Sequence, residues 1–155
     1  MGNLSGLVLA IELATEQRDA CQGRLAMAKR IVYQDKDQLS QLQVYANDKD
    51  TCWLQSGSKH FSGELVKHHY QFMDRLQQAM ALQSDVIRSS ESAVEKVVSA
   101  LLEYEIRLAG FKEVLNFRLR AKDALQKRRE QKQTDEFASQ RYSRQRAENE
   151  KGEFL

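Results

Sequence analysis

The sequence predicts an all-α protein, a long two-helix antiparallel coiled-coil hairpin with the second helix overhanging the first. Proline is absent from the 155 residues, only seven glycines occur, and charged residues make up 30% of the chain. Such a composition is typical of long helices that are exposed on several sides. We expect one domain over residues 1–155, with a first helix at about 4–54, a turn at about 55–62, a second helix at about 63–145 and a frayed C-terminal tail.

Apolar residues recur at alternating steps of three and four along two segments, which is the spacing of a coiled-coil seam. Twelve of fifteen seam positions are apolar in each segment, if Tyr104 is counted. The first seam comprises Leu4, Leu7, Ile11, Ala14, Arg18, Cys21, Leu25, Ala28, Val32, Asp35, Leu39, Leu42, Ala46, Lys49 and Trp53. The second comprises Val66, His69, Met73, Leu76, Met80, Gln83, Ile87, Ser90, Val94, Val97, Leu101, Tyr104, Leu108, Phe111 and Leu115.

The two seams are separated by one break, Gln55–Gly63, which contains Gly57 and several serines. Ser62 is placed to cap the second helix, with Glu64 in its first turn. Because the connection is short, the two helices must run antiparallel.

Folding the chain at this break pairs the two seams layer by layer. Most layers are apolar, but two are polar and would penalise slipped registers at some cost in stability. The expected layers include the polar pairs Asp35–Gln83 and Lys49–His69, the pair Cys21–Val97, and the pair Trp53–Val66 beside the turn.

One flank of the seam is apolar and the other is polar. Ten of fourteen residues on the first flank are apolar, against three of fourteen on the other. A wide apolar face also occurs where helices simply enlarge a core, but a two-helix hairpin has no third helix to cover it. A partner-binding surface and a widened core both remain open. The apolar flank comprises Ala10, Gln17, Arg24, Ile31, Gln38, Tyr45, Cys52, Leu65, Phe72, Ala79, Val86, Ala93, Ala100 and Arg107.

Beyond Leu115 the second helix has no first-helix residues left to pair with and becomes basic. Residues 118–132, the basic arm, hold seven basic and two acidic residues, a net charge of +5. A solvated helical arm and an arm that docks on an acidic protein surface both explain this charge. Nucleic-acid binding is a weaker explanation because no known reader motif accompanies the basic residues.

Catalytic and metal-binding signals are missing from the sequence. Cys21 and Cys52 lie too far apart on one helix to form a disulfide, so we expect reduced thiols. His60, His68 and His69 lack partners at metal-ligand spacing. We therefore expect no enzyme activity, no catalytic residues, no metal and no cofactor. No apolar run is long enough to span a membrane, which indicates a cytoplasmic protein, and we expect no direct membrane insertion.

Three motifs lie around the expected turn and in the tail. They are Gln38-x3-Leu42-x2-Tyr45, Phe72-x3-Leu76-x2-Ala79 and Gln131-Lys132-x2-Asp135-Glu136-Phe137-Ala138. Together with the unequal hairpin, these motifs resemble the FliJ family of the bacterial flagellar type III export apparatus. The resemblance covers nearly the whole chain.

This resemblance implies a coiled-coil stalk that serves flagellar protein export and motility. It implies contact with the hexameric export ATPase, with the cytoplasmic linker of the membrane export gate, and with export chaperones that the stalk helps to recycle. It also implies peripheral association with the inner-membrane export apparatus. The gate-binding residues would be Gln38, Leu42, Tyr45, Phe72, Leu76 and Ala79, which we name the tip patch. The ATPase-binding residues would be Arg118, Arg120, Lys122, Lys127 and Arg128, together with the face formed by Leu4–Leu25.

Two departures from the family pattern adjoin the tip patch. This chain has Lys49 where the family often has an aromatic residue, and Gln83 where it often has a histidine. Three other interpretations stay open at this point, namely the homologous stalk of a virulence injectisome, a nucleic-acid-binding coiled coil that uses the basic arm, and a purely structural coiled coil.

We predict that the isolated chain is a monomer, because each seam is satisfied by the other within the same molecule. Light scattering at micromolar concentration measures this directly. A stable dimer would contradict the intramolecular pairing.

Overall fold

A computed structural model describes residues 2–56 and 62–154, which form two helices and no strand. Helix α1 spans Gly2–Gln55 and helix α2 spans Gly63–Gly152. The predicted all-α helical hairpin is confirmed. The helix starts agree with the sequence to within two residues, which is the usual uncertainty of a helix boundary.

Serine residues mark both sides of the turn. The backbone N–H of Leu65 donates to the Ser62 Oγ at 3.3 Å, so Ser62 caps α2 as predicted. At the end of α1, the Ser56 hydroxyl donates to the carbonyl oxygen of Cys52 at 2.7 Å. The predicted turn residues Gly57 and His60 lie outside the described residues.

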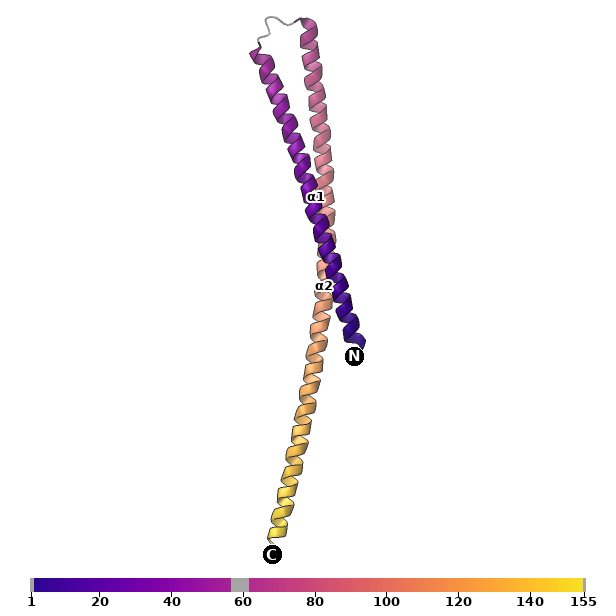
Figure 1. Cartoon of the computed structure of the whole chain (residues 1–155), viewed down its shortest axis with the longest axis vertical. Coiled ribbons are helices and arrows are strands. Elements are labelled where there is room, and N and C mark those ends of the chain that lie inside the picture. Colours follow the sequence, from indigo (N-terminus) through magenta and orange to yellow (C-terminus); the bar gives the residue numbers. More distant parts are fainter. Residues whose placement is uncertain (1, 57–61, 155) are drawn as a thin grey trace. The chain divides into compact units, whose positions relative to one another are not determined.

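The chain divides into two compact units. The hairpin unit is Leu13–Arg107, and the terminal unit combines Met1–Glu12 with Leu108–Leu155. In the hairpin unit α1 and α2 run side by side in opposite directions (Figure 1). Contacts between them join residues whose sequence separation falls towards the turn, as an antiparallel pair requires. These contacts are Cys21 with Val97, Asp35 with Gln83, and Tyr45 with Phe72.

Burial in the hairpin unit follows the predicted seam. Every described seam residue between Leu13 and Arg107 is buried or half-buried, with the exception of Lys49. The most buried side chains are those of Ala14, Cys21, Ala46 and Ile87. Three of these four residues are small, and one facing helix can cover a small side chain almost completely. The larger seam residues stay half-buried because only one helix faces each of them.

The first predicted polar layer is confirmed. The Gln83 side-chain amide donates to the Asp35 carbonyl oxygen at 2.9 Å and to the Gln38 Oε1 at 3.2 Å. The Cys21 thiol, fully buried, lies 3.8 Å from the Val97 carbonyl oxygen, which agrees with the predicted pairing of these two residues.

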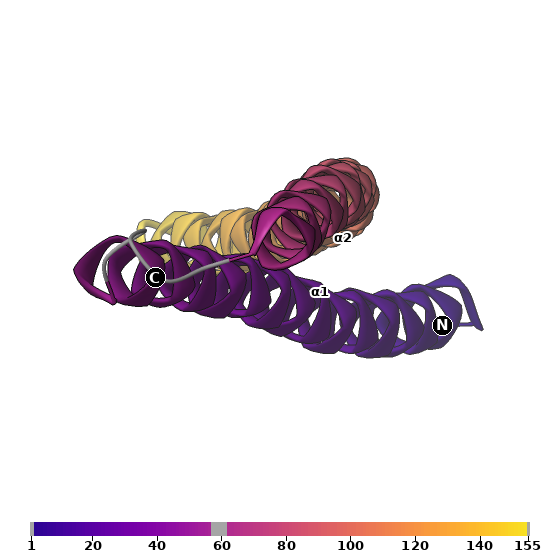
Figure 2. The same cartoon turned by 90° about the horizontal axis from the view of Figure 1, so that it is seen from above.

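The predicted Lys49–His69 layer is wrong. Lys49 is exposed and its Nζ lies 5.5 Å from the centre of the Tyr45 ring. His69 instead stacks on Trp53, with ring centres 4.1 Å apart and planes within 3°, and its Nε2 lies 3.9 Å from the Asp50 carboxylate. The physical reason is that stacking two flat rings keeps the apolar contact, whereas the lysine ammonium keeps its hydration by turning outwards. Figure 2 shows the same two helices from above, with the first turn of α2 set apart from the last turn of α1.

In the terminal unit the same seam continues as far as Leu115. Leu4, Leu7 and Ile11 of α1 are half-buried, and Leu108 of α2 is buried with 3% of its surface exposed. Every described residue from 116 to 154 is exposed. In this unit α2 therefore extends beyond the part that pairs with α1, as predicted.

Helix α2 continues to Gly152, beyond the expected end near residue 145. No glycine or proline interrupts it between Gly110 and Gly152. An ion pair between Arg146 and Glu150, four residues apart, adds local support at 3.4 Å. These features account for the extra turns of helix.

We predict that Ile87→Asp destabilises the hairpin unit by several kcal/mol, because it places a carboxylate in the seam without a partner. Ile87 is only 9% exposed. The matched control is Leu82→Asp in the same helix, where the side chain is 68% exposed and the substitution is expected to change stability by less than about 0.5 kcal/mol. Thermal unfolding followed by circular dichroism compares the two. Equal melting temperatures for the two variants would refute the seam.

Candidate functional site

The tip patch centres on two aromatic rings that lie outside the seam. Tyr45 of α1 and Phe72 of α2 meet edge to face, with ring centres 6.2 Å apart and an angle of 73° between the planes. Both remain accessible, Tyr45 at 45% and Phe72 at 39% exposure. Paired, partly exposed aromatic side chains held on two helices are typical anchors for a protein partner.

A surface depression adjoins this aromatic pair. It is lined by Gln38, Gln41, Leu42, Tyr45 and Gln83, so it contains three of the six predicted tip-patch residues. The hydrogen bond from Gln83 to Gln38 joins the two helices across it. The amide groups place donors and acceptors at the rim, while Leu42 and Tyr45 supply apolar surface. This combination suits a short peptide segment that carries both kinds of group.

The other predicted residues of the tip patch occupy the next turns of α2. Leu76, a seam residue, and Ala79, a flank residue, are both half-buried. Neither lines the depression, so their contribution to a partner contact would come through the shape of the surface that follows Phe72.

Two further residues belong to this region and were not among the predicted six. Lys49 places a cation 5.5 Å from the Tyr45 ring centre, and Gln41 lines the depression. The heptad spacing places Lys49 in the seam and therefore does not predict that its side chain points towards solvent. Gln41 lies four residues before Tyr45, and this spacing in the sequence indicates that the two side chains are neighbours on the surface of α1.

The apolar flank stays accessible beyond the tip. A second shallow groove between α1 and α2 is lined by Ala28, Ile31, Asp35, Val86, Ser89, Ser90 and Ala93. Ile31 and Val86 are about half exposed. The hairpin therefore does not cover this flank by itself, which favours a partner-binding surface over a widened core.

The opposite flank is held by charge. Lys36 Nζ lies 3.1 Å from a carboxylate oxygen of Glu91, and both side chains are about half exposed. Exposed ion pairs of this kind contribute little to stability, about 0–1 kcal/mol.

Histidines and cysteines give no catalytic arrangement in the part of the chain that the structure describes. His68 is exposed, His69 is stacked on Trp53, and His60 lies outside the described residues. Within residues 2–56 and 62–154, no group of three histidine, cysteine or acidic residues is placed to hold a metal ion. Cys21 is a buried free thiol and Cys52 an exposed one.

The predicted ATPase-binding residues are fully accessible in the terminal unit. All five are exposed on α2. Lys127 forms an ion pair with Asp123 at 3.4 Å, four residues apart on the same helix. A pair in this position leaves the charge accessible, so the basic arm presents most of its positive charge to an incoming partner.

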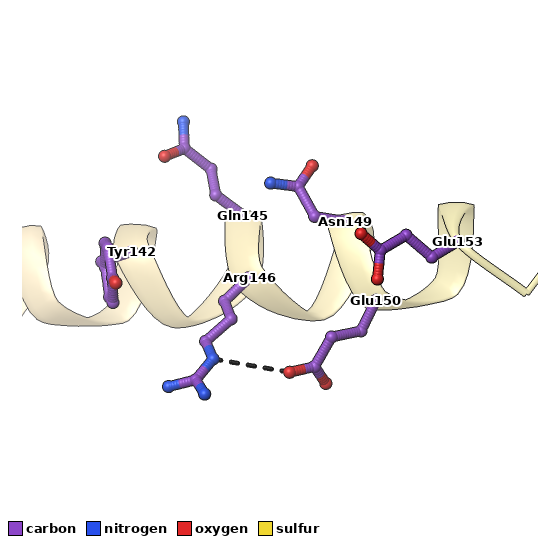
Figure 3. A pocket seen from close by; sticks show the side chains of 6 residues that line it. All are labelled: Tyr142, Gln145, Arg146, Asn149, Glu150 and Glu153. Carbon is purple, nitrogen blue, oxygen red and sulfur yellow. Dashed lines mark ion pairs between the residues drawn. The ribbon is translucent and has the colours of Figure 1, made fainter.

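A further depression lies near the C-terminal end of α2. It is lined by Tyr142, Gln145, Arg146, Asn149, Glu150 and Glu153, which all come from one helix. Figure 3 shows these side chains extending from a single ribbon, with the Arg146–Glu150 ion pair between two of them. A surface formed by one helix cannot enclose a small molecule, so we assign no site to it.

Neither helix, over the residues that the structure describes, is long and apolar enough to cross a membrane.

Comparison with known families identifies the chain. The family model described as Flagellar FliJ protein matches residues 7–147, which is nearly the whole chain. No curated protein and no solved structure gives a significant match. The family match agrees with the fold, since both helices and the region of the tip patch lie inside the matched residues. The chain therefore belongs to the Flagellar FliJ protein family and is a component connected with flagellar protein export.

Proposed function

We propose that the chain is a non-catalytic stalk of the flagellar export apparatus that binds the cytoplasmic linker of the membrane export gate through the tip patch and the hexameric export ATPase through the basic arm. In this role it promotes assembly of the ATPase hexamer and couples it to export. The observation that carries the proposal is the exposed Tyr45–Phe72 pair beside a polar-rimmed depression in a flagellar FliJ family protein.

The tip patch supports the gate contact through its chemistry. Aromatic anchors concentrate binding energy, and the neighbouring amides of Gln38 and Gln83 can satisfy the polar groups of a linker peptide. The two rings already contact each other edge to face across the helices, so less side-chain freedom is lost when a partner binds.

The terminal unit supports the ATPase contact through its charge. The basic arm carries a net charge of +5 on a helix whose described side chains are all exposed. Such a helix attracts an acidic protein surface and speeds the encounter with it. The N-terminal residues that pair with α2 in the same unit form part of the face from Leu4 to Leu25 that we assign to the ATPase.

The two contacts should be separable by mutation. Along the hairpin unit, Tyr45 lies 32 residues from Leu13, which corresponds to roughly 48 Å of helix at ~1.5 Å per residue. A substitution in the tip patch therefore leaves the terminal unit untouched.

We further propose that the stalk takes part in recycling export chaperones and that it resides in the cytoplasm at the inner-membrane export apparatus.

We predict that Tyr45→Ala combined with Phe72→Ala weakens binding to the purified gate linker by at least about tenfold, because both anchors are removed. Helicity should be unchanged, since neither residue belongs to the seam. Stimulation of the ATPase should also persist. Titration calorimetry with the linker, and turnover of the cognate ATPase, measure the two activities.

The matched control replaces two exposed tyrosines outside the tip patch. Tyr33→Ala combined with Tyr70→Ala removes similar aromatic area from side chains that are more exposed than either anchor. This control should bind the linker normally. If both double variants lost the same affinity, the tip patch would not be the specific contact.

We predict the reverse outcome for Arg118→Glu, Arg120→Glu and Lys122→Glu together, which should abolish the stimulation of ATPase turnover while linker binding persists. The reason is that three exposed cations of the arm become anions and repel an acidic partner. The control triple Arg30→Glu, Arg75→Glu and Lys96→Glu changes the net charge by the same amount at exposed positions of the hairpin unit. An equal loss of stimulation in both triples would assign the effect to net charge alone and reject the arm as the contact.

A further inference from the structure

The exposed part of α2 in the terminal unit carries an apolar stripe that the ATPase proposal does not use. Five residues, spaced three or four apart except for one adjacent pair, fall within an arc of about 100° on a helix with ~100° per residue. The larger members are prominent on the surface, Phe117 at 71% and Leu125 at 55% exposure. The apolar stripe comprises Val114, Phe117, Ala121, Ala124 and Leu125.

Cations border this stripe along both edges. Arg118, Lys122 and Arg129 follow one edge, and Arg120 and Lys127 follow the other, as the same helical spacing requires. Glu113 lies on this second edge, at the N-terminal end of the stripe. Arg128 and Lys132 close the stripe at its C-terminal end. The two acidic residues of the basic arm, Asp123 and Glu130, lie on the opposite face of the helix, together with Leu119.

We propose that, when the export ATPase does not occupy the basic arm, this face of α2 lies on an anionic phospholipid surface, with the apolar stripe inserted at the headgroup boundary. The bordering cations, most of which are those assigned to the ATPase contact, then lie on the lipid phosphates. An apolar stripe with lysine and arginine on both sides and acidic residues on the far side is the pattern of helices that lie in the plane of a membrane interface. The stems of arginine and lysine can follow the stripe while their charged ends reach the headgroups.

Charge and shape decide between lipid and a protein groove. The stripe is the convex face of one helix, and its cations point to both sides over about 27 Å between residues 114 and 132. A flat anionic surface meets both rows of cations at once, whereas a protein groove would need acidic walls on both sides of an apolar floor. Because α2 is already helical through this segment, little ordering would be needed when it binds.

Vesicle flotation with the full-length chain tests the proposal. The chain should float with vesicles of equimolar phosphatidylglycerol and phosphatidylcholine, stay in solution with pure phosphatidylcholine, and bind less as salt is raised. Adsorption by charge alone would give the same three results, so substitutions in the stripe are required to separate the two cases.

Phe117→Ser combined with Leu125→Ser keeps every charge and should lower partitioning onto anionic vesicles by at least about tenfold, because the inserted apolar groups are lost. The control Leu119→Ser combined with Phe137→Ser replaces exposed residues on the acidic side of the same helix and should partition as the parent chain does. Circular dichroism verifies that both variants stay helical.

A tryptophan probe reports insertion directly. In a Trp53→Phe background, Phe117→Trp should give a blue-shifted emission when anionic vesicles are added, and Leu119→Trp should not. The proposal is overturned if the parent chain fails to float, if the two serine variants bind vesicles equally, or if the probe at position 117 stays in water. Loss of ATPase stimulation with normal flotation in the stripe variant would instead identify the stripe as a protein-docking face.

Discussion

Packing of α1 against α2 along one heptad seam is the interaction on which the hairpin unit depends. Two helices alone can cover only one stripe of each other. The small residues Ala14, Cys21 and Ala46 are therefore the most buried, since one facing helix can cover a small side chain almost completely, and larger seam residues such as Leu25 stay half-buried. The hydrophobic gain per residue is accordingly smaller than in a globular core, and it must be repeated over many layers to hold the helices together.

The same limitation explains why this protein presents so much apolar surface. With no third helix, flank residues such as Ile31, Phe72 and Val86 are left accessible. In the part of the chain that the structure describes, the pair of helices offers shallow surface grooves, and the exposed flank residues border them. Membership of the Flagellar FliJ protein family agrees with a role in flagellar export.

Residues near the turn show how packing at the end of a coiled coil departs from a regular ladder. The heptad spacing predicts that Lys49 lies opposite His69. In the structure the imidazole of His69 instead stacks on the indole of Trp53, and the Lys49 side chain lies over the Tyr45 ring. The ammonium thereby stays hydrated beside the aromatic pair of the tip patch. This change of partner therefore links the end of the seam to the tip patch.

The sequence by itself determined the helical hairpin. Its heptad spacing and its lack of proline favour two long helices, and the single break that contains serine and glycine places the turn between them. Pairing the two helices then buries seam residues such as Leu108 and Ile87. The sequence also determined the Ser62 cap, the Asp35–Gln83 layer and the point after Leu115 where pairing ends, since all three follow from local spacing. Only the tertiary structure decided which rings meet at the tip, how far Tyr45 and Phe72 protrude, and that Gln83 reaches Gln38. Those outcomes depend on side-chain directions across two helices, and a one-dimensional pattern carries no information about them.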